Sequence, residues 1–172
     1  MKKLLVVVDM QNDFVSGALG TEEARSVVSA AEALIVREKR AGAEIVFTQD
    51  THGGDYLKTS EGRLLPVPHC MKGTEGWEIV PRLKPLAAGE KRFEKSTFAS
   101  ISLAEYARDG EYAEIALCGV CTDICVVSNA ILLKAYCPEA TVRVISAACA
   151  GTTPENHNAA LLTMRSCQIF VE

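Results

Sequence analysis

The chain has 172 residues, of which 48% are hydrophobic and 23% charged, and its net charge is −4. This balance is typical of a soluble globular protein, and a single domain over residues 1–172 can bury roughly 70% of its unfolded surface. The sequence has no basic run for nucleic acid and no apolar stretch near the roughly 20 residues that span a bilayer. We therefore expect a cytoplasmic protein with no nucleic-acid or membrane partner.

Apolar runs and helical patterns alternate along the first part of the chain. Leu4–Val8 is continuously apolar, as expected for a strand that is buried on both faces. Thr21–Arg40 is amphipathic, has acids in its first turn and is closed by Gly42, which predicts a helix. Ile45–Thr48 predicts the second strand. Residues 49–76 lack periodicity and predict a long loop, which in a compact domain is usually functional.

The second part of the chain continues the alternation. Lys91–Glu94 is a short strand pattern, and Ser102–Glu105 has the form of a capping box that opens a helix. The remaining predicted elements are strands at Ile115–Leu117, Val142–Ile145 and Gln168–Val171, and helices at Asp123–Tyr136 and Pro154–Arg165, the last capped by Thr153. Six strands that alternate with helices predict an α/β fold, in which helices cover both faces of a parallel sheet.

Reactive side chains follow four of the predicted strands. Asp9 follows the first strand, Asp50 and His52 the second, Lys95 the third and Cys125 the fourth. The carboxyl ends of parallel strands meet at one edge of a sheet, which is where ligands bind. We therefore expect these side chains to form one site.

Cys125 is the residue best placed to act as a nucleophile. It follows an apolar run and a glycine, where a helix start would lower its pKa and offer N–H donors for an oxyanion. Asp9 would accept the thiol proton, Lys95 would hold both charges, and N–H groups around Cys121 and Cys125 would stabilise the oxyanion. His157 is a commoner kind of base but lies in a predicted helix, far from the strand ends. A buried core cysteine is the structural alternative.

The cysteines also allow two other interpretations. The seven cysteines form an odd number in a chain without an export signal, which favours free thiols over a disulfide framework. Cys118, Cys121 and Cys125 could bind a metal cluster, but no fourth cysteine stands at cluster spacing. Cys121 and Cys125 could form a redox pair, although they lack the two-residue gap of thioredoxin-like motifs.

A metal site is predicted on the loop after the second strand. Asp50, His52, Glu61 and His69 supply two imidazoles and two carboxylates, a set suited to zinc, iron or manganese. Three protein ligands would leave positions open for a substrate, as a catalytic metal requires. The alternative is a polar surface loop with two ordinary histidines.

Five segments in order resemble the isochorismatase-like cysteine hydrolases and, within them, the nicotinamidases. They are Val8–Phe14 (VDMQNDF), Thr48–His52 (TQDTH), Pro68–Thr74 (PHCMKGT), Lys95–Phe98 (KSTF) and Cys118–Cys125 (CGVCTDIC). The resemblance implies a six-stranded parallel sheet between helical layers and a triad of Asp9, Lys95 and Cys125. It also implies a cis peptide bond before Cys121 and an oxyanion hole formed by the backbone N–H groups of Cys121 and Cys125.

The same resemblance gives the metal loop a role. Asp50, His52 and His69 match the ligands with which nicotinamidases hold one divalent ion, expected to be zinc, with iron and manganese as alternatives. Lys58 stands where many nicotinamidases have a further histidine, so Glu61 is the expected fourth ligand. Relatives that act on isochorismate or carbamoyl compounds typically lack these ligands.

The resemblance thus implies a small-molecule amide substrate. The first hypothesis is hydrolysis of nicotinamide to nicotinate and ammonia through a cysteine thioester, and the alternative is another small amide or carbamoyl compound. Phe14 would pack on the nicotinamide ring and Leu19 would line the pocket, while Trp77 fits either a pocket wall or the core. Relatives commonly associate, so a homo-oligomer is expected. A noncatalytic redox sensor is the third hypothesis.

Overall fold

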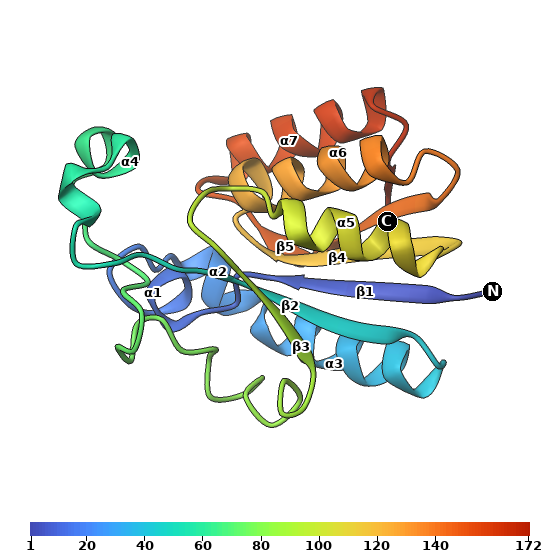
Figure 1. The fold of residues 1–172 in the computed structure, drawn as a ribbon, viewed down its shortest axis with the longest axis horizontal. Coiled ribbons are helices and arrows are strands. Elements are labelled where there is room, and N and C mark those ends of the chain that lie inside the picture. The colour runs from blue at the N-terminus through green and yellow to red at the C-terminus, as the bar shows by residue number, and fades with distance from the viewer.

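A six-stranded, all-parallel sheet forms the centre of the computed structural model, which describes residues 1–172 (Figure 1). Its strand order is β3-β2-β1-β4-β5-β6, and every neighbouring pair is parallel. The strands are β1 (Lys3–Val8), β2 (Glu44–Asp50), β3 (Lys91–Lys95), β4 (Glu114–Val120), β5 (Thr141–Ala150) and β6 (Phe170–Val171). The predicted fold class is confirmed.

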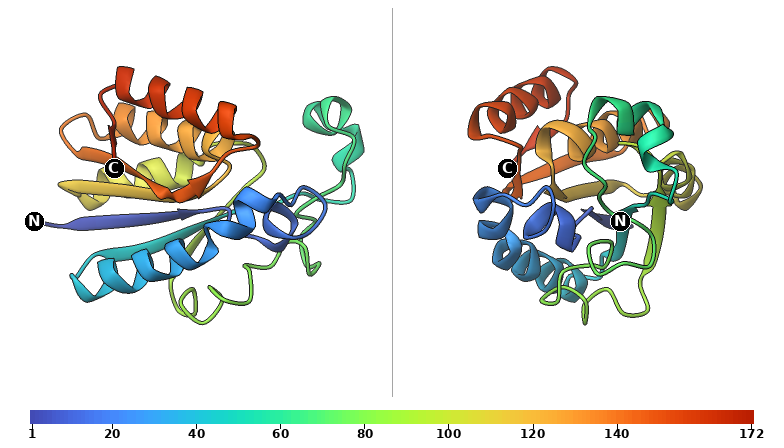
Figure 2. Two further views of the ribbon diagram at one scale, coloured as in Figure 1. Left: turned by 180° about the vertical axis from the view of Figure 1, so that it is seen from behind. Right: turned by 90° about the vertical axis from the view of Figure 1, so that its left-hand side faces the viewer.

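Helices cover both faces of this sheet. The α-helices are α1 (Asn12–Val15), α2 (Glu22–Ser26), α3 (Val28–Arg40), α4 (Ser60–Leu64), α5 (Ile101–Gly110), α6 (Val127–Tyr136) and α7 (Pro154–Ser166). The shorter helical turns are a 3-10 helix, η1 (Tyr56–Lys58), and a π-helix, η2 (Thr122–Val126). α3 lies on one face and α5, α6 and α7 on the other (Figures 1 and 2). None of the helices combines the length and apolar character needed to cross a bilayer.

The central strands are buried on both faces. Leu4–Val8 is almost completely inaccessible to solvent, as are the apolar residues of β4, and both strands belong to the main hydrophobic cluster. Continuous apolar runs are what a parallel sheet between two helical layers requires. The residues that follow β1 and β4 therefore emerge from the packed centre of the protein.

The predicted helix over Thr21–Arg40 is wrong as one element, because the chain breaks between α2 and α3. Ser26 Oγ donates to the Glu23 carbonyl at 2.7 Å, and such a bond competes with the helical backbone pattern. Val27 is both the C-cap of α2 and the N-cap of α3. The predicted N-terminus holds, since Thr21 accepts a hydrogen bond from the Ala24 N–H.

Two further boundaries differ from the sequence prediction. The helix predicted from the box at Ser102–Glu105 is instead capped by Ser100, whose Oγ accepts from the Leu103 N–H at 3.2 Å. The box pattern favours Ser102 because Glu105 stands three residues after it, but the cap is decided by the hydrogen bond between Ser100 and Leu103. The loop over residues 49–76 is not structureless, because it contains η1 and α4, the latter capped by Thr59. These helices are too short for a helical repeat of apolar residues to be visible in the sequence.

The end of β4 is shaped by a glycine that no other residue can replace easily. Gly119 has φ +118°, and a Cβ built there would lie 2.1 Å from the Val8 carbonyl oxygen. The close approach of β4 to β1 therefore depends on this glycine. The helix predicted from Asp123 is correct in extent, but its first turn is η2, and α6 follows it.

Candidate active site and metal centre

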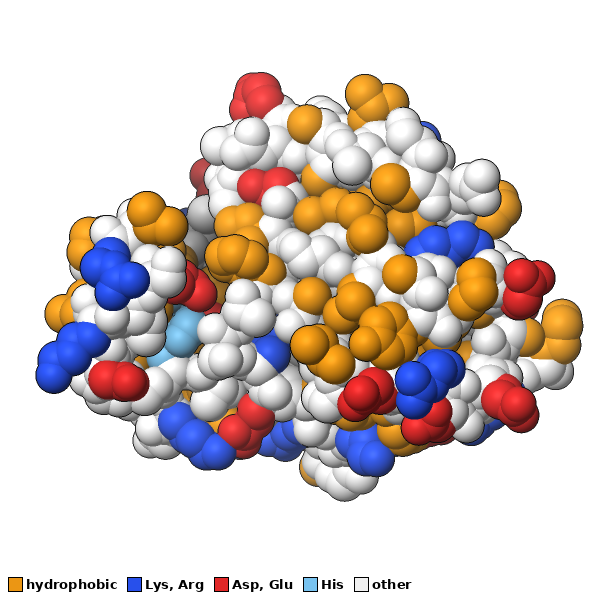
Figure 3. Space-filling view, turned by 45° about the horizontal axis from the view of Figure 1, so that its top comes forward, with side chains coloured by type: hydrophobic (Ala, Val, Ile, Leu, Met, Phe, Trp, Pro, Cys, Tyr) orange, Lys and Arg blue, Asp and Glu red, His pale blue; other side chains and the backbone are white.

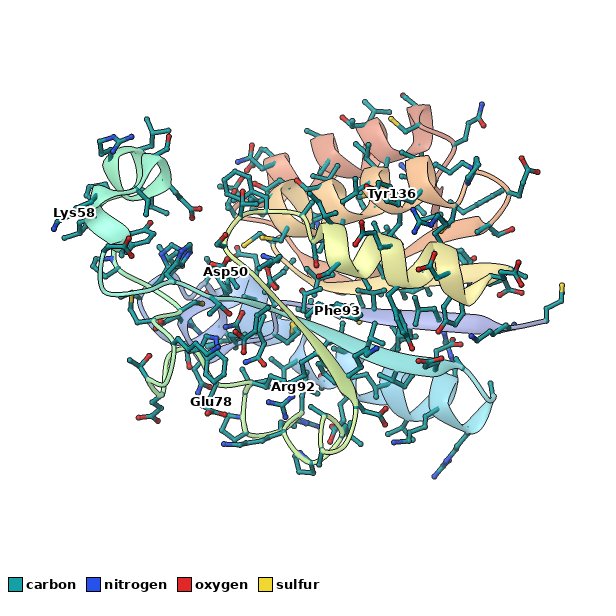
Figure 4. All side chains as sticks on the ribbon, in the orientation of Figure 1. Asp50, Lys58, Glu78, Arg92, Phe93 and Tyr136 are labelled. Atoms are coloured by element: carbon teal, nitrogen blue, oxygen red, sulfur yellow. The ribbon has the colours of Figure 1, made fainter.

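The four expected strand ends meet at one edge of the sheet. Asp9 follows β1, Asp50 and Lys95 are the last residues of β2 and β3, and Cys125 lies in η2 just after β4. Figure 4 labels Asp50 at this edge, on the side of the molecule where α4 projects. The structure therefore brings these side chains together, as the parallel topology predicts.

Asp9, Lys95 and Cys125 are in direct contact. Lys95 Nζ lies 2.6 Å from Asp9 Oδ2 and 3.5 Å from Cys125 Sγ. Asp9 is completely buried, and the other two side chains are nearly so. An acid, a cation and a thiol in one buried cluster are the parts that a base-assisted thiol nucleophile needs.

Burial controls the ionisation of this cluster. It raises the pKa of Asp9 above its ordinary value, against the opposing charge of Lys95. It also raises the pKa of the Cys125 thiol, and Asp9 adds to that rise. For Lys95, burial acts to lower the pKa, but the negative charges of Asp9 and Asp50 outweigh it, so the pKa is raised. The resting cluster thus holds a neutral thiol, a charged lysine and an unusually basic aspartate.

The expected low pKa of Cys125 is therefore wrong for the free protein. Cys125 is the fourth residue of η2 and is buried beneath it, rather than lying at the exposed N-terminus of a helix. Desolvation opposes the thiolate more strongly than the helix start favours it. The thiol must consequently lose its proton to a neighbouring base when it reacts.

Thr48, which the sequence argument did not single out, orients Asp9. Thr48 Oγ1 donates to Asp9 Oδ1 at 2.6 Å and accepts from the Asp9 N–H at 3.2 Å. Asp9 itself has φ +47°, a left-handed conformation that aspartate adopts more readily than most residues. The only sequence signal for Thr48 is its place at the start of the TQDTH segment.

The turn between β4 and Cys125 has the geometry that the resemblance implies. The Val120–Cys121 peptide bond is cis, and the Cys121 N–H donates to no other backbone group. Asn129 fixes the next turn, because its Nδ2 donates to the Cys125 carbonyl at 2.8 Å and its Oδ1 accepts from the Ser100 N–H at 3.0 Å. This buried amide ties the segment after Lys95 to the turn that carries Cys125.

The four predicted metal ligands also converge. One donor atom from each of Asp50, His52, Glu61 and His69 lies within 4.8 Å of every other. Asp50 Oδ2 is 3.0 Å from His52 Nε2 and 3.3 Å from His69 Nε2, and Glu61 Oε1 is 3.7 and 3.6 Å from the same two nitrogens. Two imidazoles and two carboxylates facing one point fit a divalent ion such as zinc.

Neighbouring groups hold these ligands in position. His69 Nδ1 lies 2.8 Å from the Val67 carbonyl, so it carries the hydrogen and leaves Nε2 free to coordinate. Gln11 accepts from the Asp50 N–H at 2.7 Å and donates to the Asp50 carbonyl at 2.9 Å. Tyr56 packs edge-on against both histidine rings, at 4.7 and 5.1 Å between centroids. The donor set is thus ordered by the protein itself.

The four predicted metal ligands, which we call the metal group, lie beside the cluster of Asp9, Lys95 and Cys125, which we call the thiol cluster. Lys95 Nζ is 3.6 Å from Asp50 Oδ1 as well as 2.6 Å from Asp9. Figure 3 shows a hollow between the α4 lobe and the body of the molecule, with histidine atoms visible inside it. Glu61 reaches the group from α4, whereas Lys58 is exposed on η1 (Figure 4). Lys58 therefore makes no contribution to the ligand set.

Of the residues expected to line the substrate pocket, one lies beside the four predicted metal ligands. The ring of Phe14 is 5.5 Å from that of His69, so Phe14 does flank the metal group. Leu19 is half-buried and packs against the core. Trp77 is also half-buried, and its indole N–H donates to Thr51 Oγ1 at 2.9 Å. Trp77 therefore both packs on the core and supports the loop next to the metal ligands.

The expectation that His157 lies far from the strand ends is wrong. Its Nδ1 is 2.8 Å from Thr122 Oγ1, next to Cys121 in the chain. The reason is topological, since α7 starts directly beyond the carboxyl end of β5, the neighbour of β4. His157 makes no hydrogen bond with Cys125, so the structure still offers it no role as the base for the thiol.

All seven cysteines are free.

Comparison with known proteins places these features in a family. The family model described as the Isochorismatase domain matches residues 3–172. The nicotinamidase of Escherichia coli (strain K12) is 30% identical over 154 residues, which cover 72% of this chain and 72% of that protein. The structure of nicotinamidase/pyrazinamidase PncA from Bacillus subtilis aligns over 99% of both chains, with 34% identity and a TM-score of 0.88. The pyrazinamidase of Pyrococcus horikoshii, solved in complex with zinc, aligns over 100% of this chain and 99% of its own, with 28% identity and a TM-score of 0.86.

Proposed function

Because the chain belongs to the isochorismatase family and is a nicotinamidase-like amidohydrolase, we propose that it converts nicotinamide to nicotinate and ammonia with the help of one bound divalent metal ion. The observation that carries this proposal is the position of Lys95, which contacts Asp9 at 2.6 Å and the metal group at 3.6 Å through Asp50. A thiol cluster and a metal group that share a lysine can act on one small molecule. Similarity to the Escherichia coli nicotinamidase supports the same substrate.

We propose that Asp9, Lys95 and Cys125 carry out the covalent steps. Asp9 takes the proton from the Cys125 thiol, and the thiolate attacks the amide carbonyl carbon. The N–H groups of Cys121 and Cys125 donate to the oxyanion of the tetrahedral intermediate. Asp9 then gives the proton to the departing nitrogen, which leaves as ammonia, and a thioester remains on Cys125. Water hydrolyses the thioester to nicotinate and restores the thiol.

We further propose that Asp50, His52, Glu61 and His69 hold the metal ion. When bound, the ion would supply a Lewis acid for the pyridine nitrogen, which orients the ring toward Cys125. Phe14 would pack against the ring from the side of His69, and Leu19 would extend that apolar wall. Zinc is the proposed ion because two imidazoles and two carboxylates suit it, and because the Pyrococcus horikoshii relative was solved with zinc.

We also propose that residues 1–172 form a single domain. Strands from both ends of the chain, β1 and β6, belong to one sheet, which supports one folding unit. The homo-oligomeric state and the cytoplasmic location that the sequence suggests stay predictions.

The direct test is ammonia release by protein reconstituted with zinc. We expect nicotinamide to be hydrolysed at least 100-fold faster, in kcat/KM, than a carbamoylated amine, because only the aromatic amide has a ring nitrogen for the metal group. This ratio corresponds to about 2.7 kcal/mol of transition-state stabilisation. Preferential hydrolysis of the carbamoyl compound by the zinc-loaded protein would contradict the proposal and favour the alternative substrate class.

The rate should depend on pH through Asp9. As the pH falls through the pKa of Asp9, its carboxylate becomes protonated and can no longer accept the thiol proton, so kcat/KM falls. Because burial raises that pKa, the acid limb should lie above the ordinary aspartate value of about 4. A pH profile of kcat/KM measures it, and metal content measured at each pH separates it from loss of the ion. An acid limb at the ordinary aspartate value would contradict the assignment.

A further inference from the structure

The turn that would hold the oxyanion is attached to the start of α7 by side chains that the proposed mechanism leaves unused. Thr122 is completely buried, and its Oγ1 lies 2.8 Å from His157 Nδ1. Asp123 accepts two hydrogen bonds from Thr152, at 2.8 Å from its N–H and 2.6 Å from its hydroxyl. Thr122 and Asp123 lie between Cys121 and Cys125, so both contacts act on the segment that supplies the two N–H donors.

The packing at this junction is too close to be incidental. A Cβ built on Gly151 would lie 2.9 Å from Asp123 Oδ1 and 2.8 Å from the Cβ of His157. Any larger residue at Gly151 would therefore push α7 away from the turn. A further bond from Asn156 Nδ2 to Thr152 Oγ1, at 2.9 Å, ties the anchor to the first turn of α7.

The hydrogen bond between Thr122 and His157 does not change its charge state at neutral pH. Burial lowers the pKa of His157 below its ordinary value, against the opposing charge of Asp123. The imidazole is therefore neutral in this range, and the hydroxyl and the ring can share one hydrogen bond without a net charge. The ring forms a hydrogen bond with the turn only through Thr122, so its influence on the chemistry is indirect.

We propose that His157 and Thr152 are positioning residues for the oxyanion-binding turn, acting through Thr122 and Asp123. This inference rests on the proposed function, because it concerns the N–H groups of Cys121 and Cys125. Donors to a developing oxyanion must already point at it before the reaction, since turning them during the reaction costs free energy. Two anchors, Thr152 just before α7 and His157 within it, keep the peptide planes of the turn in one orientation.

Thr122→Val is the most direct test in the full-length, zinc-loaded protein, because it removes the hydroxyl and preserves the side-chain shape. We expect kcat for nicotinamide to fall about 10- to 100-fold, less than the loss of a whole oxyanion donor, with KM changed less than about 3-fold. Ground-state binding does not use the oxyanion donors, so the loss should lie in kcat. Thr122→Ser, which keeps the hydroxyl, should stay within about 3-fold of wild type.

A second variant and a matched control separate positioning from stability. His157→Phe keeps a planar ring on the half-buried side of α7 but removes the nitrogen, and it should reproduce the loss in kcat. The two changes combined should cost no more than either alone, because they break one interaction. Thr163→Val is the control, since it removes a hydroxyl on the same helix that bonds only to the Ala159 carbonyl, and it should leave kcat unchanged.

Amide hydrogen exchange of residues 121–126 gives a readout that needs no substrate. Both variants should exchange these amides at least about 10-fold faster than wild type, with the β-strand amides unchanged. A wild type that releases no ammonia from nicotinamide would contradict the proposed function. The exchange rates alone would then show whether the contact between His157 and Thr122 holds the turn in place. Unchanged exchange at 121–126, unchanged kcat in an active enzyme, or a loss equally large in Thr122→Ser would overturn the anchor.

Discussion

Replacement of Cys125 by alanine is expected to reduce ammonia release from nicotinamide by at least about 10⁴-fold, the scale seen when a covalent nucleophile is removed from a hydrolase. Cys125 Sγ is the thiol that contacts Lys95, and the two carboxylates that also contact this lysine have other partners: Asp9 is held by Thr48, and Asp50 faces His52 and His69. Initial rates with the zinc-loaded variant measure the loss. Cys167→Ala is the matched control, because Cys167 is exposed at the end of α7 and should have no effect.

The same variant tests the thioester directly. Hydroxylamine added to wild type should divert part of the product to the hydroxamate, because it competes with water for the acyl group on Cys125. The diverted fraction should rise with hydroxylamine concentration and vanish in Cys125→Ala. If Cys125→Ala keeps more than about one hundredth of wild-type activity, or if it still forms hydroxamate, the thiol mechanism is wrong.

The sheet and the edge that carries the site could be predicted from the sequence because they follow from strong local patterns. Leu4–Val8 can bury its apolar side chains on both faces only between two helical layers, and that requirement places β1 at the centre of the sheet. Once the strands are parallel, Asp9 and Lys95 must emerge at the same edge. Topology alone places Asp9 and Lys95 at one edge, and their 2.6 Å contact across β2 depends on strand register and side-chain direction as well.

The short helical elements could not be predicted in the same way. η1 and α4 are single turns fixed by caps and by Tyr56, whose hydroxyl donates to the Leu65 carbonyl at 2.8 Å. Such elements depend on contacts between residues in the loop rather than on a repeating pattern. The break between α2 and α3 and the choice of Ser100 as cap likewise depend on individual hydrogen bonds, those of the Ser26 and Ser100 hydroxyls.

Long-range polar contacts were the other part that the sequence could not supply. Thr48 is 39 residues from Asp9, and His157 is 35 residues from Thr122. Neither pair stands in a spacing that indicates contact, so each side chain looked ordinary in the sequence. The raised pKa of Cys125 was missed for a related reason, because the degree of burial depends on the whole assembled site.

Loss of the metal ion should have the second largest effect. Wild type is expected to bind about one zinc ion per chain. His52→Ala or His69→Ala should lower the zinc content of the purified protein, and each should lower kcat/KM for nicotinamide by at least about 100-fold. Changes to residues that merely support a metal ligand already cost about 10- to 100-fold, and these two histidines would be ligands themselves. Metal analysis of the purified proteins and steady-state kinetics measure the two effects.

The metal should also stabilise the folded chain, because the four donors lie within 4.8 Å of one another only after folding. Zinc at 100 times its Kd would add about 2.7 kcal/mol to the free energy of unfolding, which for a chain of this size corresponds to a rise in Tm of roughly 5–10 °C. His157→Phe is the informative comparison, since it should lose kcat through the oxyanion turn yet keep its zinc and its shift in Tm. A His52→Ala variant that binds zinc and gains the same Tm would show that the ion binds elsewhere, and the proposed grip on the pyridine nitrogen would then be wrong while the thiol chemistry of Cys125 would stand.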